Sequence, residues 1–294
     1  MRAAANHAEP VFEVDKLEEH LLALSDDLPM AHFGLRALDL ILGGVHPGLL
    51  YTLGTGPGKG KTTLALQEAD KLAADGHPVI FVSAELPQHK LLEKSIARLS
   101  RGELPLSEVA AASSPDHPEH GAFTSALAMY RDLIAPNMCI TGGLNMAELG
   151  RLVGACINDR GQTPIVFLDY LQLIACGASS EPILDERLAI ASCVASLRNI
   201  ASSYSVPIIA LSSTTRGSYA AKKPDLSIFG GSSAVEYSFD AALYLADDTD
   251  EPDSSFNLPV GTPLKLVALK NRYGTLGTTK LDFDGKHACF HDLA

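Results

Sequence analysis

A glycine-rich loop between an apolar strand and a helix is the feature that most constrains how this chain can fold. Residues 55–62 read Thr-Gly-Pro-Gly-Lys-Gly-Lys-Thr, which fits G-x-x-x-x-G-K-[ST] except that Thr55 occupies the first glycine position. The apolar residues 49–53 predict a strand before the loop, and residues 62–74 predict a helix after it. A loop of this kind between a strand and a helix is a phosphate-binding loop, or P-loop. Its backbone N–H groups are predicted to surround a chain of phosphates.

Each residue type in this loop suits contact with a nucleotide. Gly56, Gly58 and Gly60 let the backbone curl so that several N–H groups face one phosphate chain. We expect Lys61 to reach the β- and γ-phosphates and Thr62 to ligate Mg²⁺. The loop residues predicted to bind Mg-ATP are Gly56, Pro57, Gly58, Lys59, Gly60, Lys61, Thr62 and Thr63.

Strands and helices alternate along the rest of the chain. Short apolar segments predict strands, and longer segments with helical spacing predict helices. The predicted strands are residues 49–53, 78–82, 138–141, 164–168, 207–211, 241–245, 264–269 and 278–283. The predicted helices are residues 62–74, 88–99, 122–133, 146–158 and 184–203. This alternation indicates an α/β fold with a mostly parallel central sheet and helices on both faces.

Two carboxylates follow predicted strands and suit ATP hydrolysis. Asp169 ends an apolar strand, where a P-loop protein places the carboxylate that holds the magnesium shell. Asp169 and Thr62 are therefore the predicted metal-binding residues. Glu85 follows the strand after the P-loop unit, and strand carboxyl ends converge on the ligand crevice of such a sheet. Glu85 is accordingly the predicted general base.

These motifs, in this order, resemble the ATPase domain of the DnaB-type replicative helicases. The resemblance runs from about residue 38 to residue 290. Besides the P-loop, it rests on residues 43–48, 83–86, 169–173 and 270–274, the last followed by Gly277. The resemblance implies a RecA-like P-loop ATPase fold that uses ATP and Mg²⁺. It also implies a ring, expected to be a hexamer, that acts on single-stranded DNA.

Residues 270–274 resemble the family element that reaches into the ATP site of the neighbouring subunit. By that resemblance Arg272 is an arginine finger acting in trans, and Lys270 is a second contact to the γ-phosphate. An arginine finger supplies positive charge where negative charge spreads in the transition state. Activity would then require an assembly of subunits.

The sequence departs from the family pattern near the expected phosphate and DNA contacts. Ser213 stands where the family has a phosphate-sensing glutamine, and its shorter side chain would need water to bridge to phosphate. Arg216 matches a family arginine and is, with Ser213, a predicted nucleotide contact. The expected DNA-contacting loop at residues 229–233 reads Phe-Gly-Gly-Ser-Ser, which loses the family's charges but leaves backbone N–H groups for phosphate.

Charge and composition limit the classes of function. The net charge of −12 argues against a strongly basic nucleic-acid binder, although a ring could still have a locally positive pore. The five cysteines include no C-x-x-C pair and indicate reduced thiols rather than a metal site or a disulfide framework. We expect no membrane contact and a cytoplasmic location, because the sequence has no long apolar run and no secretory signal.

The predicted domain organisation is an N-terminal arm at residues 1–30 and an ATPase domain at residues 31–294. Residues 11–24 have the spacing of a short amphipathic helix, which could pack on its own domain or on a neighbouring subunit. The family's large N-terminal domain, which helps organise the ring and recruits primase, has no counterpart in this sequence. Neither property therefore carries over, and a loader or primase-like partner stays an open expectation.

Two other interpretations stay open from the sequence alone. Residues 270–274 also resemble the signature of RadA, so a RadA-like or KaiC-like ATPase is one alternative, although Gly277 and residues 169–173 favour the DnaB type. The other is a nucleotide-switched accessory protein without unwinding activity. The acidic charge, Ser213 and the uncharged loop at residues 229–233 favour that alternative.

Overall fold

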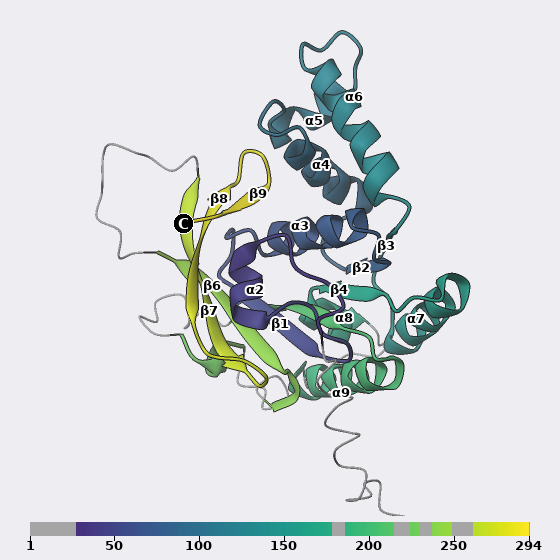
Figure 1. Cartoon of the computed structure of the whole chain (residues 1–294), viewed down its shortest axis with the longest axis vertical. Coiled ribbons are helices and arrows are strands. Elements are labelled where there is room, and N and C mark those ends of the chain that lie inside the picture. Colours follow the sequence, from purple (N-terminus) through teal and green to yellow (C-terminus); the bar gives the residue numbers. More distant parts are fainter. Residues whose placement is uncertain (1–27, 178–185, 215–223, 230–236, 249–260, 294) are drawn as a thin grey trace, which may run out of the picture.

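One mixed sheet runs through the computed structural model, which describes residues 28–177, 186–214, 224–229, 237–248 and 261–293 (Figure 1). Within these residues the strand order is β3-β2-β4-β5-β1-β6-β7-β8-β9. The strands are β1 (Leu50–Thr55), β2 (Val79–Ser83), β3 (Met138–Thr141), β4 (Ile165–Asp169), β5 (Ile208–Ser213), β6 (Ala241–Asp247), β7 (Thr262–Asn271), β8 (Thr278–Asp284) and β9 (Cys289–Asp292). Neighbours from β3 to β6 are parallel, and those from β6 to β9 are antiparallel. The predicted mostly parallel sheet is confirmed.

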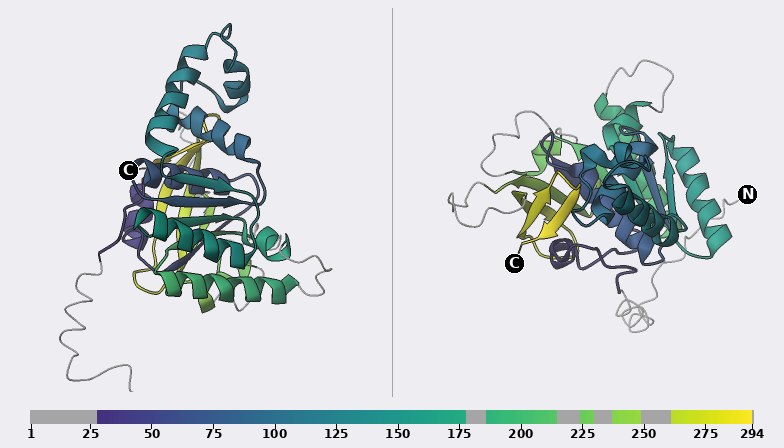
Figure 2. Two further views of the ribbon diagram at one scale, coloured as in Figure 1. Left: turned by 90° about the vertical axis from the view of Figure 1, so that its right-hand side faces the viewer. Right: turned by 90° about the horizontal axis from the view of Figure 1, so that it is seen from above.

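Helices cover both faces of this sheet, as predicted (Figure 2). The helices are α2 (Arg36–Leu42), α3 (Lys61–Ala74), α4 (Gln88–Leu99), α5 (Val109–Ala112), α6 (His120–Met129), α7 (Met146–Arg160), α8 (Leu171–Gly177) and α9 (Glu186–Tyr204). Short helical turns lie at η2 (Leu106–Glu108), η3 (Tyr130–Ile134) and η5 (Leu226–Phe229). Helices α2 and α3 pack on one face, and α7, α8 and α9 pack on the other. Because the central strands are buried on both sides, their sequences are mostly apolar, as in β4, where Asp169 follows four apolar residues.

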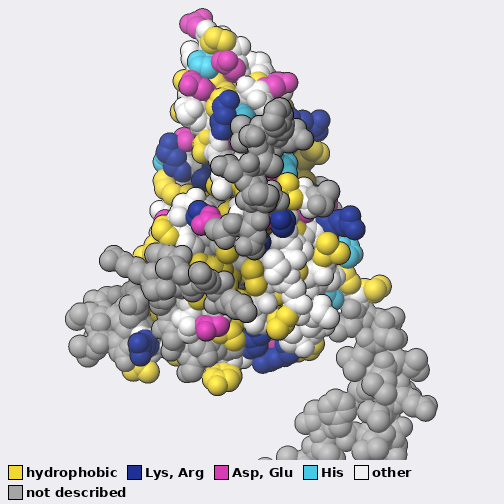
Figure 3. Space-filling model, turned by 90° about the vertical axis from the view of Figure 1, so that its left-hand side faces the viewer, with side chains coloured by type: hydrophobic (Ala, Val, Ile, Leu, Met, Phe, Trp, Pro, Cys, Tyr) yellow, Lys and Arg dark blue, Asp and Glu magenta, His cyan; other side chains and the backbone are white. Residues whose placement is uncertain are grey.

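A helical projection made of α4, α5, α6 and η3 stands beyond the sheet (Figures 1 and 2). Its small apolar core includes Ile96, Leu104 and Ala126 and is separate from the two cores on the sheet. On the face that Figure 3 shows, acidic, basic and histidine side chains are interspersed over this projection. Among the described residues of the projection on that face, charges of both signs are mixed, which differs from the basic patch expected of a phosphate-backbone surface.

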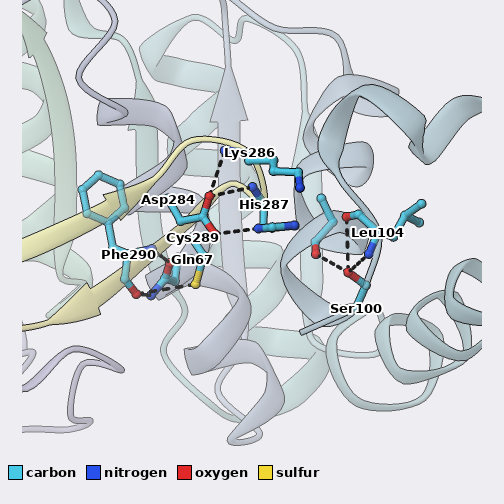
Figure 4. Close-up of polar contacts among 9 residues, drawn as sticks. Gln67, Ser100, Leu104, Asp284, Lys286, His287, Cys289 and Phe290 are labelled. Atoms are coloured by element: carbon cyan, nitrogen blue, oxygen red, sulfur yellow. Dashed lines mark hydrogen bonds and ion pairs between the residues drawn. The ribbon is translucent and has the colours of Figure 1, made fainter. Parts of the chain in front are cut away.

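The C-terminal hairpin of β8 and β9 joins the helix after the P-loop to the helical projection (Figure 4). The Gln67 side chain of α3 donates to the Phe290 carbonyl at 2.9 Å, and the Phe290 N–H donates back to Gln67 at 2.7 Å. At the tip of the hairpin, the Leu106 N–H donates to the Lys286 carbonyl at 2.8 Å. The hairpin thus fixes the projection relative to the P-loop helix.

Several elements differ from the sequence-based expectations. Helices α2, α5 and α8 and strand β9 are not among the predicted elements. These elements are short, and contacts with distant segments hold them: the Asp292 carboxylate accepts hydrogen bonds from the N–H groups of Arg36 and Ala37. The predicted amphipathic helix at residues 11–24 lies outside the described residues. None of the described helices is both long and apolar enough to cross a membrane.

We predict that Glu68 makes the stability of the fold depend on pH. Its side chain is buried, burial raises its pKa from 4.5 to about 7, and its Oε2 accepts the Gly34 N–H at 2.5 Å. A raised carboxyl pKa contributes stability below the unfolded-state value, and that contribution is lost as pH rises through about 7. The free energy of unfolding should therefore fall by roughly 3 kcal/mol between pH 4 and pH 8 on account of this group.

Chemical denaturation of the wild type and of Glu68→Gln across this pH range measures the effect. The Gln variant should lose this part of the pH dependence, whereas Glu103→Gln, which changes an exposed glutamate, should keep it. A Glu68→Gln variant with the wild-type pH profile would contradict the assignment.

Candidate active site

The carboxyl ends of the central parallel strands converge on one open cavity of about 430 Å³. The register pairs Thr55 at the end of β1 with Ser213 at the end of β5, and Ser83 of β2 with Asp169 of β4. Parallel strands place their carboxyl ends at the same edge, so residues far apart in sequence meet there. The cavity is lined by Thr55, Gly56, Pro57, Gly58, Lys59, Gly60, Lys61, Thr62, Thr63, Glu85, Leu86, Lys94, Tyr170, Ser213, Thr214 and Phe283.

The P-loop keeps its curled shape through glycine at position 60. Gly60 has φ of 83° and precedes the first residue of α3, a helix of 14 residues. A Cβ atom at this position would lie 2.8 Å from the rings of both Phe283 and Phe290, which stack with centroids 4.5 Å apart. Only glycine avoids both the left-handed strain and this clash. The hairpin aromatic pair therefore supports the P-loop directly.

Thr62 and Asp169 are brought together as the sequence predicts for a magnesium site. The Thr62 hydroxyl donates to Asp169 Oδ2 at 2.8 Å. Asp169 is completely buried, and burial raises its pKa to about 6 against the lowering effects of Thr62 and Lys61. Its second oxygen, Oδ1, is buried without a hydrogen-bond partner. A buried carboxylate oxygen without a partner is costly unless a ligand satisfies it, so this pair fits a hydrated divalent cation.

Lys61 lies among carboxylates on the floor of the cavity. Burial lowers its pKa below the ordinary lysine value, while the charges of Asp169 and Glu85 partly offset that shift. Its ammonium stands 4.6 Å from the centre of the Tyr170 ring. A lysine held this way presents a positive charge to an anionic ligand in the loop.

Glu85 lies on a turn at the end of β2 that is held by its own hydrogen bonds and by one contact to β4. The Ser83 hydroxyl donates to the Leu86 carbonyl at 2.6 Å and accepts the Leu86 N–H at 3.2 Å. The Ala84 N–H donates to the Asp169 carbonyl at 2.6 Å, which ties the turn to the end of β4. Glu85 itself is exposed and lines the cavity. This geometry leaves its carboxylate free to contact water beside the phosphate site.

Ser213 lies in the cavity wall, where Gln172 fixes its backbone. The Gln172 side chain accepts the Ser213 N–H at 3.0 Å and donates to the Ser212 hydroxyl at 2.8 Å. Thr214 donates from its hydroxyl to the Thr55 carbonyl at 3.0 Å. The first turn of α8 and the ends of β1 and β5 are thereby linked beside the P-loop, and the short side chain of Ser213 leaves space in the cavity.

Lys94 is a cavity residue that the sequence analysis missed. It lies on α4, and its ammonium donates to the Thr63 hydroxyl at 3.1 Å. Burial lowers its pKa, with the nearby positive charge of Arg98 acting in the same direction. One signal was available: α4 begins directly after the Glu85 turn, so its first turns start at the same edge of the sheet. Lys59, which also lines the cavity, forms an ion pair with Asp247 at the end of β6.

Arg272 and Lys270 lie away from the cavity of their own chain. Arg272 donates to Asp240 Oδ1 at 3.0 Å, and Oδ2 of the same carboxylate accepts the Leu50 N–H at 2.9 Å. Leu50 begins β1 and Thr55 ends it, so the strand separates the two places by roughly 16 Å at about 3.3 Å per residue. Neither cation therefore belongs to its own chain's P-loop cavity. Arg216 and most of the loop at residues 229–233 lie outside the described residues.

Comparison with known proteins identifies the family. The DnaB-like helicase C-terminal domain family matches residues 31–292. This chain belongs to that family. The DnaB replicative helicase of Pasteurella multocida is 27% identical over 266 residues, which are 89% of this chain and 55% of that protein. The DnaB replicative helicase of Treponema pallidum is 29% identical over 266 residues, 87% of this chain and 55% of that protein. The chain thus spans about half the length of these DnaB relatives.

Solved structures give the same DnaB-type fold. A DnaB-like replicative helicase, solved in a study of its interactions with primase, superposes with a TM-score of 0.80 at 22% identity. The match covers 96% of this chain and 69% of that one. A solved ATPase domain gives the same TM-score at 21% identity and is covered over 99% of its length. The predicted DnaB-type resemblance and RecA-like fold are therefore confirmed.

We predict that Lys94→Met weakens nucleotide binding about tenfold. The reason is the loss of one partly buried positive charge from the cavity wall, since a charge-assisted hydrogen bond contributes about 1.5–3 kcal/mol. Equilibrium titration with a fluorescent ATP analogue measures the change. Lys90→Met is the matched control, because Lys90 is exposed on the same helix and pairs with Glu93. Equal affinities for the two variants would show that Lys94 does not contact the nucleotide.

Proposed function

We propose that this chain hydrolyses Mg-ATP and works as a DnaB-type helicase or translocase on single-stranded DNA. The observation that carries the ATPase proposal is the Thr62–Asp169 hydrogen bond, which leaves the second oxygen of a buried carboxylate without a partner directly behind a cavity lined by Lys61 and Thr62. Family membership supports the choice of DNA as the substrate on which the ATPase acts.

Each residue of the cavity has a distinct part in this proposal. Thr62 and Asp169 hold Mg²⁺, which when bound would neutralise charge on the phosphate oxygens. Lys61 binds the β- and γ-phosphates, and backbone N–H groups of the loop and the start of α3 orient them. Glu85 positions a water molecule and accepts its proton. Lys94 adds a second positive charge from α4.

The position of Arg272 and Lys270 supports a site completed by a neighbouring subunit. Both cations lie at the opposite edge of the sheet from their own P-loop, so they cannot serve it. In a ring, that edge of one subunit can face the P-loop edge of the next. We propose that Arg272 is the arginine finger of the neighbour's site and that Lys270 contacts the same γ-phosphate. A hexamer is the expected ring.

The remaining partners follow from the family. The solved DnaB-like helicase was studied with primase, which makes a primase-like or loader protein a candidate partner of this chain. A cytoplasmic location suits a protein that works on replicating DNA. A nucleotide-switched accessory protein is the second candidate function, and the serine at position 213 together with the net charge of −12 favours it.

We predict that Lys61→Ala abolishes ATP hydrolysis. The variant removes the charge that holds the β- and γ-phosphates, while the sheet and the helix cores stay intact. A steady-state phosphate-release assay on wild type and variant measures the effect, with Lys71→Ala as the control. Lys71 lies on the same helix but pairs with Asp75 on its exposed side. Unchanged turnover in Lys61→Ala would reject this cavity as the ATP site.

We further predict that two inactive variants restore activity when they are mixed. Arg272→Ala keeps its own P-loop residues, and Glu85→Gln keeps its Arg272, so some boundaries in a mixed ring would contain a complete site. Turnover should partly recover as the two proteins are titrated against each other. Absence of recovery, with co-assembly demonstrated by mass, would show that both residues serve the same subunit's site.

A further inference from the structure

Residues 237–240, here called the anchor segment, bind three cations that come from two different elements. The Tyr237 carbonyl accepts hydrogen bonds from Lys270 Nζ and from Arg272, both at 3.2 Å. Arg198 of α9 donates to the Ser238 carbonyl and pairs with Asp240 Oδ2 at 2.8 Å. The two proposed trans cations are thus held by one short stretch of chain.

Asp240 is the fixed point of this arrangement. Its side chain is 2% exposed, whereas that of Arg272 is 47% exposed. Oδ1 accepts a hydrogen bond from Arg272, and Oδ2 accepts one from the Leu50 N–H and forms an ion pair with Arg198. In addition, the Arg272 N–H donates to the Asp240 carbonyl at 2.8 Å. A buried carboxylate with this many partners has one orientation, and so does the arginine stem bound to it.

We propose that Asp240 is a positioning residue for the ATP site of the neighbouring subunit: it orients Arg272 directly and Lys270 through the Tyr237 carbonyl. This inference rests on the proposed function of Arg272 in trans. A guanidinium has five N–H donors, and the contacts with Asp240 and Tyr237 use two of them. The half-exposed side of Arg272 keeps donors available for a phosphate that arrives from outside the chain.

Arg198 prevents Asp240 from using both carboxylate oxygens to bind Arg272. A single buried carboxylate facing one arginine would form a closed two-point pair with it. Here Arg198 and the Leu50 N–H occupy Oδ2, so only Oδ1 is left for Arg272. The contact to Leu50 also fixes the trans cations relative to β1, the strand that carries the subunit's own P-loop.

Asp240→Asn in the 294-residue chain tests the proposal. The substitution is close to isosteric but removes the charge that holds Arg272, and a displacement of about 1 Å can cost roughly 100-fold in rate. We expect the ATP turnover of the assembled variant to fall by about that factor. Asp240→Glu keeps the buried charge and moves it by one methylene, so it serves as the second variant if Asn impairs folding.

The matched control is Asp248→Asn. Asp248 follows the other end of β6 and is also a buried carboxylate paired with two cations, Lys265 at 2.7 Å and Lys280 at 2.9 Å. It lies away from Arg272, so its loss should affect thermal stability without a comparable fall in turnover. A similar fall in both variants would mean that Asp240 acts through general stability, which would overturn the proposal.

Mixing assigns the effect to the right subunit. Asp240→Asn mixed with Glu85→Gln should recover activity, since the first provides an intact P-loop site and the second an intact Arg272. Asp240→Asn mixed with Arg272→Ala should not recover, because both lack a working finger. The positioning role alone would be overturned by a different result: activity recovers when Arg272→Ala is mixed with Glu85→Gln, but does not recover when Asp240→Asn is mixed with Glu85→Gln. If neither pair recovers, with co-assembly demonstrated, the proposed trans site itself fails, and the positioning role fails with it.

Discussion

The hydrogen bond from Thr62 to Asp169 joins the P-loop helix α3 to the end of strand β4, and the candidate site depends on this contact. Thr62 lies in the first turn of α3, and Asp169 ends β4, two strands away from β1 in the sheet. The bond can form only when β1, β5 and β4 stand in their parallel register, because that register places the end of β4 beside the P-loop. It also leaves one buried oxygen of Asp169 without a protein partner beside the P-loop helix, which supports the proposed cation site.

The sheet separates two chemical roles by placing them at opposite edges. At the carboxyl ends of the parallel strands lie the P-loop and Glu85, which line the cavity, and Asp169, which is buried behind Thr62; these residues suit the proposed binding of ATP and activation of water. At the amino ends lie Asp240 and the cations bound to it. Strand β1 runs between them, with Leu50 in one group and Thr55 in the other. A ring would bring the P-loop edge of one subunit to the Arg272 edge of the next. ATP hydrolysis would then require assembly of the subunits.

Much of the P-loop edge could be predicted from the sequence, because it obeys local rules. A glycine-rich loop between strand and helix fixes the positions of Lys61 and Thr62, and a carboxylate at the end of an apolar strand fixes Asp169. The fold class followed from the alternation of apolar strands with helices. Lys94 was missed because its role depends on how α4 packs over Thr63, which spacing along the chain does not encode.

The edge that carries Asp240 and Arg272 was less predictable, because its contacts also join residues that are far apart in the sequence. Arg272 was found by resemblance, but the sequence says nothing of Asp240, which lies 32 residues earlier and meets Arg272 through the antiparallel pairing of β6 with β7. The support of Gly60 by Phe283 and Phe290 likewise depends on β9, a strand too short to stand out in the sequence. Long-range side-chain contacts of this kind appear only in the folded chain.

The most direct test of an ATP site shared between subunits is steady-state ATP hydrolysis by the purified chain, with and without single-stranded DNA, while the particle mass is measured in solution. We predict a particle several times the 31.1 kDa of one chain, whose turnover rises when DNA is added. A 31.1 kDa monomer that hydrolyses ATP at a rate that does not change when DNA is added would contradict the composite site. A monomer that binds ATP without turning it over would instead favour the nucleotide-switched accessory protein.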